Sequence, residues 1–535
     1  MTVGRRGRVL SALGLSVSLL GVYVLTNAGR IDIIDGQIRY EVAANWLTTG
    51  EPTLRDRALT GTVFATRTER ATYGNYNAGA SVSAMPLMVL SRLLPGHTAE
   101  RDRFAFSMTG PFFGAAVAGL LAIAYGMLGL GATAALAWAA ITALTTLWWP
   151  ASVTVFDQNQ HAFFLLTAVL LAWQSGRRAS VRWAALAGLA GGVLLVYQEI
   201  YAMLLPFVGL AVFARTDATR PASPWWRSSS VDYRALLRYI VFGAGCGVGL
   251  LGFVAFNYVR FGTPLAPERY GSLWFSGNPV AGALSLALSP GKSIVLFSPP
   301  VILALFGARG LFKRAPMLVA VMGLISLVHV VLIVQLPFFG GDWCWGPRYL
   351  LVLVALWALA LPFATEHLSR PVVGIIVTLG LVVQLMGIGI DHQRFFLERD
   401  FRPYFWVDQW VYFRHSQLLA RPGELLKLAR DGVPLEATRF SPTPQGQITY
   451  TPGGPPSTGR PGLVWARQFV VFHTLRPWPF WIYRLEPMRR PIEPLPLLTV
   501  CGVFVVGGLA LVRLGLQRRS GHVGHPDPIR RASAA

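Results

Sequence analysis

The sequence has few charged residues. Asp, Glu, Lys and Arg make up 13% of its 535 residues, whereas soluble chains carry roughly 25%. Hydrophobic residues make up 53%, the mean hydropathy is +0.48, and several apolar runs reach the ~20 residues needed to cross a bilayer. This composition excludes an ordinary soluble globular protein. It predicts an all-α polytopic membrane protein.

Cysteine, acidic residues and lysine are also scarce. The three cysteines, Cys246, Cys344 and Cys501, lie far apart and match no metal-ligand spacing, so no disulfide framework or cysteine metal cluster is indicated. Asp and Glu number 25 against 47 Lys and Arg, for a formal net charge of +22. The basic residues lie mostly between apolar runs rather than on one soluble face. They therefore favour anionic membrane lipid as a partner over nucleic acid.

The apolar runs and the basic loops between them predict a topology. Cytoplasmic loops collect Lys and Arg, and with Arg5, Arg6 and Arg8 inside, every short basic loop falls on the same side. About 12 spans result, near 9–28, 105–128, 132–150, 158–175, 183–197, 200–214, 239–258, 293–308, 317–336, 350–365, 372–390 and 493–512. The first span resembles a signal peptide, but it is long enough to cross the membrane, so we expect it to stay uncleaved.

Segment 79–95 is the ambiguous part of this topology. It is apolar but short and is broken by Pro86, so we interpret it as re-entrant or interfacial. If it were a true span, the orientation of everything after it would invert.

Three regions follow from the topology. Residues 1–390 form a transmembrane catalytic module whose first outer loop is 29–104. Residues 391–492, rich in Pro, Arg and aromatic residues, form a small extracytoplasmic segment. Residues 493–535 contain the last transmembrane helix and a cytoplasmic tail. We expect a multi-pass protein of the cytoplasmic (inner) membrane, with both termini cytoplasmic and the active site facing outside.

With this sidedness, ionisable residues gather in the predicted outer loops. The acids are Asp32, Asp35, Asp56, Asp157 and Glu199, and the bases are Arg260, Arg269, Lys292 and Arg348. Such a set suits transfer from a lipid phosphate to an acceptor hydroxyl. A carboxylate takes the proton of the acceptor, and cations stabilise the charge that develops on the leaving phosphate.

Asp35 is the candidate general base. It follows the first span and opens a helix-like run in which Ile38, Val42 and Trp46 share one face. The alternative interpretation is that Asp35 and Gly36 merely form a turn and a helix start, where both residue types are common.

The other candidates also have structural alternatives. Lys292, in the loop SPGKS, is placed to contact a phosphate or to anchor the span by snorkelling. Arg348, in GDWCWGPRY, lies among aromatic residues that elsewhere form an interfacial belt. Asp157 either orients the acceptor or the base, or caps a helix. Glu199 is a functional candidate because charge inside a membrane is costly, unless it faces water. We expect His161 to be a packed or capping residue.

Taken together, the motifs resemble those of the GT-C superfamily of membrane glycosyltransferases, which includes protein O-mannosyltransferases and lipid A aminoarabinose transferases. The resemblance covers most of residues 10–390. It rests on the Asp35-Gly36 stretch with Tyr40, Ala43 and Gly50, and on FDQNQ, FNYVRFGTPL, LSPGKSIVLFSPP and GGDWCWGPRYLL. The chain departs from the commoner pattern at YGNYNAG (73–79), where a Lys/Pro-rich stretch is often seen, and at Gln198-Glu199, where a Thr-Arg pair is common.

The resemblance implies an inverting glycosyltransferase that moves a sugar from a polyprenyl-phosphate donor to a hydroxyl of a glycan, lipid or protein acceptor. It gives Asp35 the role of base and Asp157 a supporting role. Lys292 and Arg348 would contact phosphate. Arg260, Glu199, Tyr40 and Asp32 are further substrate-binding candidates by their place in the predicted first turns and outer loops, and the resemblance gives Glu199 no role. No cofactor is certain; the outer carboxylates leave a divalent cation open.

Two other functions remain open from the sequence. A transporter or flippase of a lipid-linked glycan would be expected to carry charges at mid-membrane, often in two related halves. The spans here are mostly free of charge, and the sequence has no internal repeat. A non-catalytic scaffold that binds a partner through 391–492 would not need Asp35 or Asp157.

Overall fold

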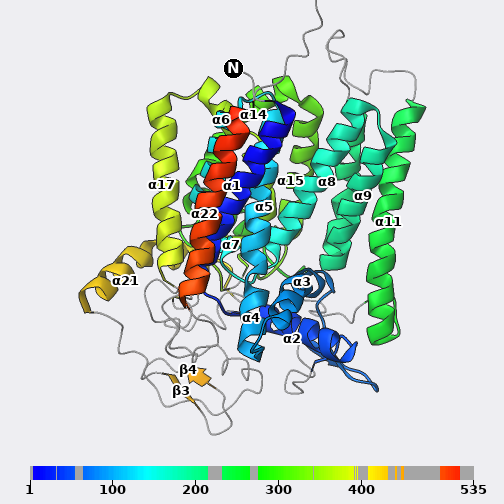
Figure 1. Cartoon of the computed structure of the whole chain (residues 1–535), viewed down its shortest axis with the longest axis vertical. Helices are drawn as coiled ribbons and strands as arrows, with labels where there is room; N and C mark the ends of the chain where they lie inside the picture. Colours follow the sequence, from blue (N-terminus) through cyan, green and yellow to red (C-terminus); the bar gives the residue numbers. More distant parts are fainter. Residues whose placement is uncertain are drawn as a thin grey trace, which may run out of the picture.

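The computed structural model describes residues 4–31, 33–54, 64–214, 232–265, 275–341, 343–390, 392, 395, 408–431, 440–442, 448–450 and 494–518. These residues form a bundle of helices with two short strand pairs (Figure 1). The expectation of an all-α membrane fold is confirmed. Within the described residues, six helices are long and apolar enough to cross a membrane: Arg5–Thr26, Arg101–Met127, Tyr233–Phe261, Pro316–Val334, Arg370–Gly389 and Leu498–Gln517.

The helices follow the apolar runs of the sequence. The long upright helices in Figure 1 are α1 (Arg5–Thr26), α5 (Thr109–Met127), α6 (Ala132–Thr145), α8 (Gln158–Arg178), α9 (Val181–Tyr197), α11 (Tyr233–Phe261), α15 (Pro316–Val334), α17 (Arg370–Gly389) and α22 (Pro494–Gln517). The α11 helix shows why they begin and end where they do. Asp232 accepts hydrogen bonds from the first free backbone N–H groups, and Gly262 ends the helix at φ 70°.

Several expected spans are built from shorter pieces. Residues 200–214 form a 3₁₀ helix (Glu199–Met203), α10 (Leu205–Gly209) and a second 3₁₀ helix (Leu210–Phe213). Residues 293–314 form α13 (Ile294–Phe297), a 3₁₀ turn (Pro299–Ile302) and α14 (Leu303–Arg314). Residues 348–366 form a 3₁₀ turn (Arg348–Leu350), α16 (Leu351–Ala358) and a 3₁₀ helix (Leu361–Glu366). A short helix, α7 (Trp148–Ser152), follows α6. The total of about 12 spans remains a prediction.

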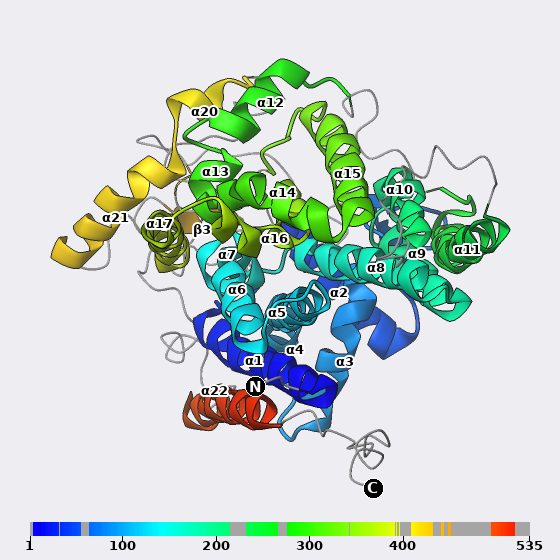
Figure 2. The same ribbon diagram turned by 90° about the horizontal axis from the view of Figure 1, so that it is seen from above.

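Both ends of the described chain lie at one end of the bundle. The N–H of Gly4 donates to the carbonyl of Arg518 at 3.2 Å, and α1 and α22 pack side by side in both views (Figures 1 and 2). Small residues permit this approach, because a Cβ on Gly14 would lie 2.6 Å from the carbonyl oxygen of Gly508. The two ends of the described chain therefore lie at the same end of the bundle, and the cytoplasmic orientation of the termini remains a prediction.

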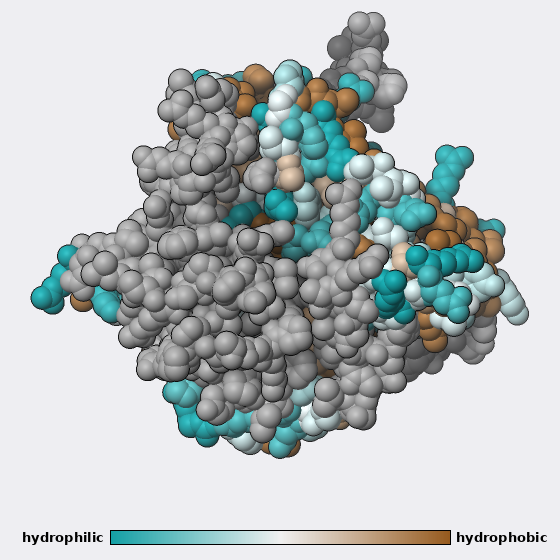
Figure 3. All heavy atoms as spheres, turned by 90° about the horizontal axis from the view of Figure 1, so that it is seen from below, coloured by the Kyte–Doolittle hydropathy of each residue, from teal (hydrophilic) through white to brown (hydrophobic). Residues whose placement is uncertain are grey.

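The opposite end of the bundle carries the first predicted outer loop. There α2 (Ile34–Thr49), α3 (Gly79–Leu93) and α4 (Ala99–Ser107) lie against each other (Figure 1). The strands β1 (Ala65–Arg67) and β2 (Thr72–Gly74) pair antiparallel beside them. Segment 79–95 thus forms α3 beneath the upright helices. Viewed from this end, hydrophilic and hydrophobic side chains both appear on the described surface, with one group of hydrophilic side chains in its upper middle (Figure 3).

Part of the predicted extracytoplasmic segment packs on the bundle. Its described elements are α20 (Val411–Arg414), α21 (Gln417–Asp431) and the strand pair β3 (Phe440–Pro442) and β4 (Ile448–Tyr450). Of these, α20 and the residues between it and α21 contact the loop that follows α12 (Pro279–Leu288). The N–H of Gly291 donates to the carbonyl of Tyr412 at 3.0 Å, and the hydroxyl of Ser416 donates to the carbonyl of Pro290 at 2.5 Å. Residues 411–416 therefore help to fix the loop that contains Lys292.

Candidate active site

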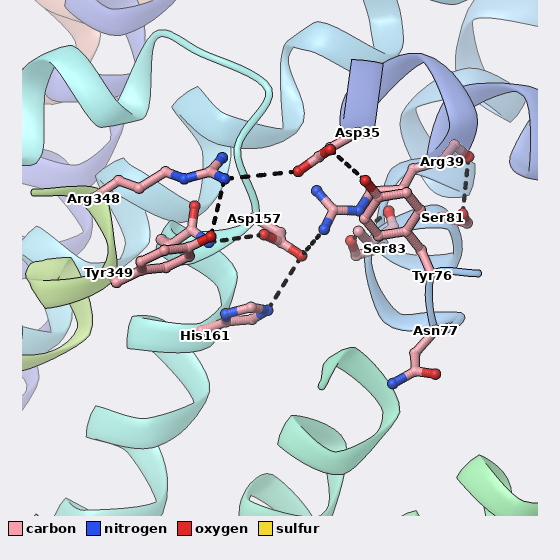
Figure 4. Close-up of polar contacts among 12 residues, drawn as sticks. Asp35, Arg39, Tyr76, Asn77, Ser81, Ser83, Asp157, His161, Arg348 and Tyr349 are labelled. Carbon is pink, nitrogen blue, oxygen red and sulfur yellow. Dashed lines mark hydrogen bonds and ion pairs between the residues drawn. The ribbon is translucent and has the colours of Figure 1, made fainter. Parts of the chain in front are cut away.

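Asp35 lies in the first turn of α2, where the partial positive charge of a helix N-terminus favours a carboxylate. One of its oxygens accepts a hydrogen bond from the hydroxyl of Tyr76, and the other lies 3.8 Å from a guanidinium nitrogen of Arg348 (Figure 4). Its side chain remains 21% exposed. Asp35 thus combines a fixed orientation, a neighbouring cation and access from outside.

Gly36 brings α2 close to the segment that leads to Asp157. A Cβ on Gly36 would lie 2.4 Å from a methyl group of Val155, which is closer than any real contact. The approach sets Arg39, one turn after Asp35, against Asp157: the guanidinium lies 2.8 Å from the carboxylate. The two predicted catalytic acids are therefore linked through one turn of α2.

Asp157 is the N-cap of α8 and is only 4% exposed. Besides Arg39, it faces Nε2 of His161 at 3.4 Å. Burial alone would raise the pKa of Asp157, but the charges of Arg39 and His161 outweigh it and hold this pKa well below its usual range. Asp157 is therefore a permanent anion, better suited to holding Arg39 than to exchanging protons.

His161 occupies the core between Asp157 and an aromatic group. It is 1% exposed, its Nδ1 lies 2.9 Å from the hydroxyl of Tyr201, and its ring packs edge-on against Tyr197 and Tyr201. Its position agrees with the expected packed or capping residue. The structure also places His161 against the carboxylate of Asp157, a contact that the sequence did not indicate. This contact helps to orient that carboxylate.

Arg348 is 7% exposed, and aromatic rings surround its guanidinium. The guanidinium carbon lies 4.0 Å from the ring centre of Phe156 and 5.0 Å from that of Tyr349. The preceding loop turns at Gly341 (φ 80°) and Gly346 (φ 65°), where glycine avoids the steric cost of a side chain. The loop places a cation beside Asp35 in surroundings that exclude water on one side.

Lys292 fixes the loop that carries Arg348. It is 1% exposed, and its Nζ donates to the carbonyls of Cys344 at 3.0 Å and Gly346 at 2.9 Å. The sequence favoured contact with phosphate or snorkelling to the headgroups. The structure instead places the ammonium group inside the protein, on the backbone carbonyls four and two residues before Arg348.

Arg260 fixes the backbone of the strand that leads to Tyr76, as Lys292 fixes the loop before Arg348. Its guanidinium donates to the carbonyls of Gly74 at 2.5 Å and Tyr76 at 2.8 Å, and to Asn257 at 2.6 Å. It is 3% exposed. Arg260 therefore sets the position of Tyr76, and through it the hydrogen bond to Asp35.

The remaining predicted residues lie outside this cluster. Glu199 is exposed and accepts a hydrogen bond from Asn77 at 2.7 Å, which ties the first outer loop to the turn after α9. Tyr40 points toward α4, where its hydroxyl donates to the carbonyl of Ala99 at 3.3 Å. Asp32, Asp56 and Arg269 lie outside the described residues. No group of three acids, histidines or cysteines that could hold a metal ion occurs in the described ranges.

Two small cavities flank the cluster. One, of about 50 Å³, is lined by Phe156, Gln158 and Arg348 together with Trp345 and His392. The other, of about 30 Å³, is lined by Gln158, Tyr201 and Tyr349. Arg348 lines the first space and Tyr349 lines the second, and Gln158, the residue after Asp157, lines both. A substrate group next to Arg348 would enter from the first cavity.

Three residues of the cluster were not predicted as site residues: Arg39, Tyr76 and Tyr349. Arg39 follows Asp35 by four residues, a spacing that places both on one helical face, so the sequence did contain its signal. Tyr76 lies in YGNYNAG, which departs from the resemblance. Nothing in its local sequence indicates that it would contact Asp35.

We expect Asp157→Asn to reduce transfer about 10- to 100-fold without abolishing it, as substitutions of supporting residues do. The lost charge should also lower the free energy of unfolding by about 1.5–3 kcal/mol. Since folding lowers the pKa of Asp157, this stabilisation is present above the unfolded-chain value of about 3.9 and is lost as the pH falls through the folded-state value. Thermal denaturation in detergent should show a constant gap to wild type between pH 7 and 5 that narrows only below about pH 4.

We expect Arg260→Met to release the backbone before Tyr76 and to lower the free energy of unfolding by about 2 kcal/mol, since it leaves buried carbonyls without donors. The rate of the predicted glycosyl transfer should fall together with this stability. Thermal inactivation in detergent measures the change, with Arg67→Met, at an exposed arginine of β1, as the matched control. Equal inactivation temperatures for the two variants would show that Arg260 does not hold this backbone.

A scan of protein-family models and a search of curated proteins found no match to this sequence. Solved structures with a similar arrangement include ArnT from Cupriavidus metallidurans in the apo state, at 13% identity and a TM-score of 0.46, over 94% of this chain and 76% of that one. The same ArnT bound to undecaprenyl phosphate matches with a TM-score of 0.43, at 13% identity, over 96% of this chain and 77% of that one.

The archaeal oligosaccharyltransferase AglB from Archaeoglobus fulgidus, in complex with an inhibitory peptide and a dolichol-phosphate, is a further similar structure. It matches at 13% identity and a TM-score of 0.39, over 70% of this chain and 54% of that one.

Proposed function

We propose that this protein is an inverting glycosyltransferase that moves a sugar from a polyprenyl-phosphate donor to an acceptor hydroxyl on the outer face of the cytoplasmic membrane. The observation that carries the proposal is the pairing of Asp35 with Arg348. A partly exposed carboxylate and a buried guanidinium lie 3.8 Å apart at the end of a bundle of apolar helices. This is where a lipid headgroup would meet a water-borne acceptor.

In the proposed reaction Asp35 removes the proton of the acceptor hydroxyl as its oxygen attacks the anomeric carbon of the sugar. The bond from that carbon to the phosphate oxygen breaks, and polyprenyl phosphate leaves with the electron pair. A single displacement inverts the configuration at the anomeric carbon. The proton then passes from Asp35 to solvent, which its 21% exposure allows.

Arg348 has the complementary role of stabilising the negative charge on the leaving phosphate. A guanidinium presents several N–H donors in a plane and suits phosphate oxygens. Its aromatic surroundings lower the local dielectric and strengthen the interaction. Since phosphate departs as a stable anion, the reaction needs no general acid, and none of the described residues has to supply one.

Asp157, Arg39 and Tyr76 act as positioning residues in this scheme. Asp157 holds Arg39 at 2.8 Å, and the guanidinium of Arg39 lies over the ring of Tyr76, 4.6 Å from its centre. Tyr76 in turn donates to Asp35. The chain of contacts aims the second oxygen of Asp35 toward the space beside Arg348.

The test is mass spectrometry of cell-envelope glycans, glycolipids and glycoproteins in a deletion strain complemented with wild type or with Asp35→Asn. We expect one glycosylated product to disappear on deletion, to return with wild type and to stay absent with Asp35→Asn at normal expression. Full restoration by Asp35→Asn would contradict the proposal. A third outcome is that the product is restored and that only the distribution of a lipid-linked glycan between the two leaflets changes. That outcome would favour a transporter or flippase.

A further inference from the structure

A third, larger cavity lies at the other end of the bundle. Its volume is about 360 Å³, within the usual range of ligand sites. Its lining comes from the first turns of α1 and α6, the last turns of α5 and α8, and the start of α9. In the view from this end, α5 lies beside α1, α6 and α8 (Figure 2). The cavity is thus on the side of both termini, far from Asp35.

The inner part of this cavity is apolar. Its walls include Leu120, Ile123, Leu136 and Leu170. Ile123 is 37% exposed, and Val9, also in the lining, is 49% exposed. Exposed aliphatic residues on membrane helices face lipid. The cavity therefore opens toward acyl chains as well as toward the membrane surface.

The outer part of the cavity is cationic. Arg5, Arg8 and Arg178 line it, and all three are exposed. The described lining contains no acidic residue, and none of the described carboxylates forms an ion pair with these three arginines. Trp183, an aromatic residue of the kind found at membrane interfaces, lies 5.9 Å from the guanidinium of Arg178. Three positive charges thus line a space to which none of the described residues contributes an anion.

The depth of the cavity matches one leaflet. Its lining extends along α8 from Thr167 to Arg178, a rise of roughly 16 Å at 1.5 Å per residue. Half of a hydrocarbon core of ~30 Å is about 15 Å. A free phosphate would occupy only the cationic mouth. A phospholipid would place its phosphate at the arginines and an acyl chain along the apolar walls.

We propose that this cavity binds an anionic phospholipid from the leaflet on the side of the termini. The phosphate lies among Arg5, Arg8 and Arg178, and one acyl chain lies between α5, α6 and α8 beside Leu120 and Leu136. The site is separate from the proposed transfer reaction, since it lies at the opposite end of the bundle. It ties the start of α1 to the ends of α5 and α8 whenever the lipid is bound.

The experiment measures binding of phosphatidylglycerol to the purified full-length protein by native mass spectrometry, with phosphatidylcholine and inorganic phosphate as the other two probes. The test variant is Arg5→Gln/Arg8→Gln/Arg178→Gln. The matched control is Arg309→Gln/Arg370→Gln/Arg513→Gln, which removes the same charge from three exposed arginines in the predicted cytoplasmic parts but outside the cavity lining. A second variant, Ala122→Phe, fills part of the apolar lining and keeps the charges. Thermal denaturation checks that each variant is folded.

We expect phosphatidylglycerol to bind wild type and the control alike. Binding to the test variant should fall about 100-fold, because each basic residue near a headgroup contributes about fivefold. Ala122→Phe should also weaken it. Equal loss in the test and control variants would overturn the proposal, since charge alone would then explain binding. Equal affinity for phosphatidylcholine, or full competition by inorganic phosphate, would overturn it as well.

Discussion

An Asp35→Asn variant is expected to lose transfer activity by about 10²- to 10⁴-fold, the usual contribution of a general base. The amide cannot take the proton of the acceptor, yet it has nearly the shape of the carboxylate and still accepts a hydrogen bond from Tyr76. Folding should be unaffected, because Asp35 is partly exposed and lies at a helix start. The measurement is transfer of radiolabel from a membrane lipid extract by the purified protein in proteoliposomes.

The control for Asp35→Asn is Glu51→Gln, which removes an exposed carboxylate just after the other end of α2. It should transfer at the wild-type rate. Binding of undecaprenyl phosphate should be unchanged in both variants, since the base acts on the acceptor rather than on the phosphate. If Asp35→Asn transferred as fast as Glu51→Gln, Asp35 would not be the base.

The second large effect is expected for Arg348→Ala, which should lower transfer about 10²- to 10³-fold, as loss of one group that stabilises developing charge does. Unlike Asp35→Asn, it should also weaken binding of undecaprenyl phosphate, because in the proposed reaction the guanidinium contacts the phosphate before and after transfer. Arg348→Lys should recover only part of the activity, since an ammonium group lacks the planar set of donors. Binding and transfer rates measured on the same preparations separate the two effects.

Arg67→Ala is the matched control for Arg348→Ala, because Arg67 is an exposed arginine of the first outer loop. It should bind and transfer as wild type does. An Arg348→Ala protein that bound undecaprenyl phosphate normally and transferred at the control rate would exclude Arg348 from phosphate contact. The phosphate would then have to be held by another cation.

Much of the helical fold follows from the sequence, because long apolar runs have only one stable form in a membrane. The predicted span 105–128 corresponds to α4 and α5, and 372–390 to α17. The Pro-broken segment 79–95 was distinguished from a span by its length and Pro86, and it forms α3 beneath the bundle. Irregular spans such as 293–314 could not be predicted in detail, because their proline-interrupted turns depend on tertiary packing.

The candidate site could be predicted only in part. Chemical type and sidedness were enough to single out Asp35, Asp157 and Arg348, which the structure brings together. They were not enough to place Lys292 and Arg260, because a sequence does not reveal whether a cation near the membrane will meet a ligand or a backbone carbonyl. Tyr76 reaches Asp35 across 41 positions of chain, a contact that local patterns do not contain.

Two buried cations, Lys292 and Arg260, hold the backbone on either side of Asp35 in place. Lys292 holds the loop before Arg348, and Arg260 holds the backbone at Tyr76. Lys292 donates to the carbonyls four and two residues before Arg348, and Arg260 donates to the carbonyl two residues before Tyr76 and to that of Tyr76 itself. The two sides of the site are therefore positioned independently, one by the loop 340–348 and the other by β2 and the residues after it. The carboxylate of Asp35 lies where the two sides meet.

The most direct test of the central claim is a cryo-electron microscopy structure of the protein in lipid nanodiscs with undecaprenyl phosphate. The account predicts phosphate density within hydrogen-bonding distance of the guanidinium of Arg348. The space between that phosphate and the carboxylate of Asp35 should be wide enough for one sugar ring. Phosphate bound away from Arg348, or Asp35 turned from it toward the protein interior, would contradict the account.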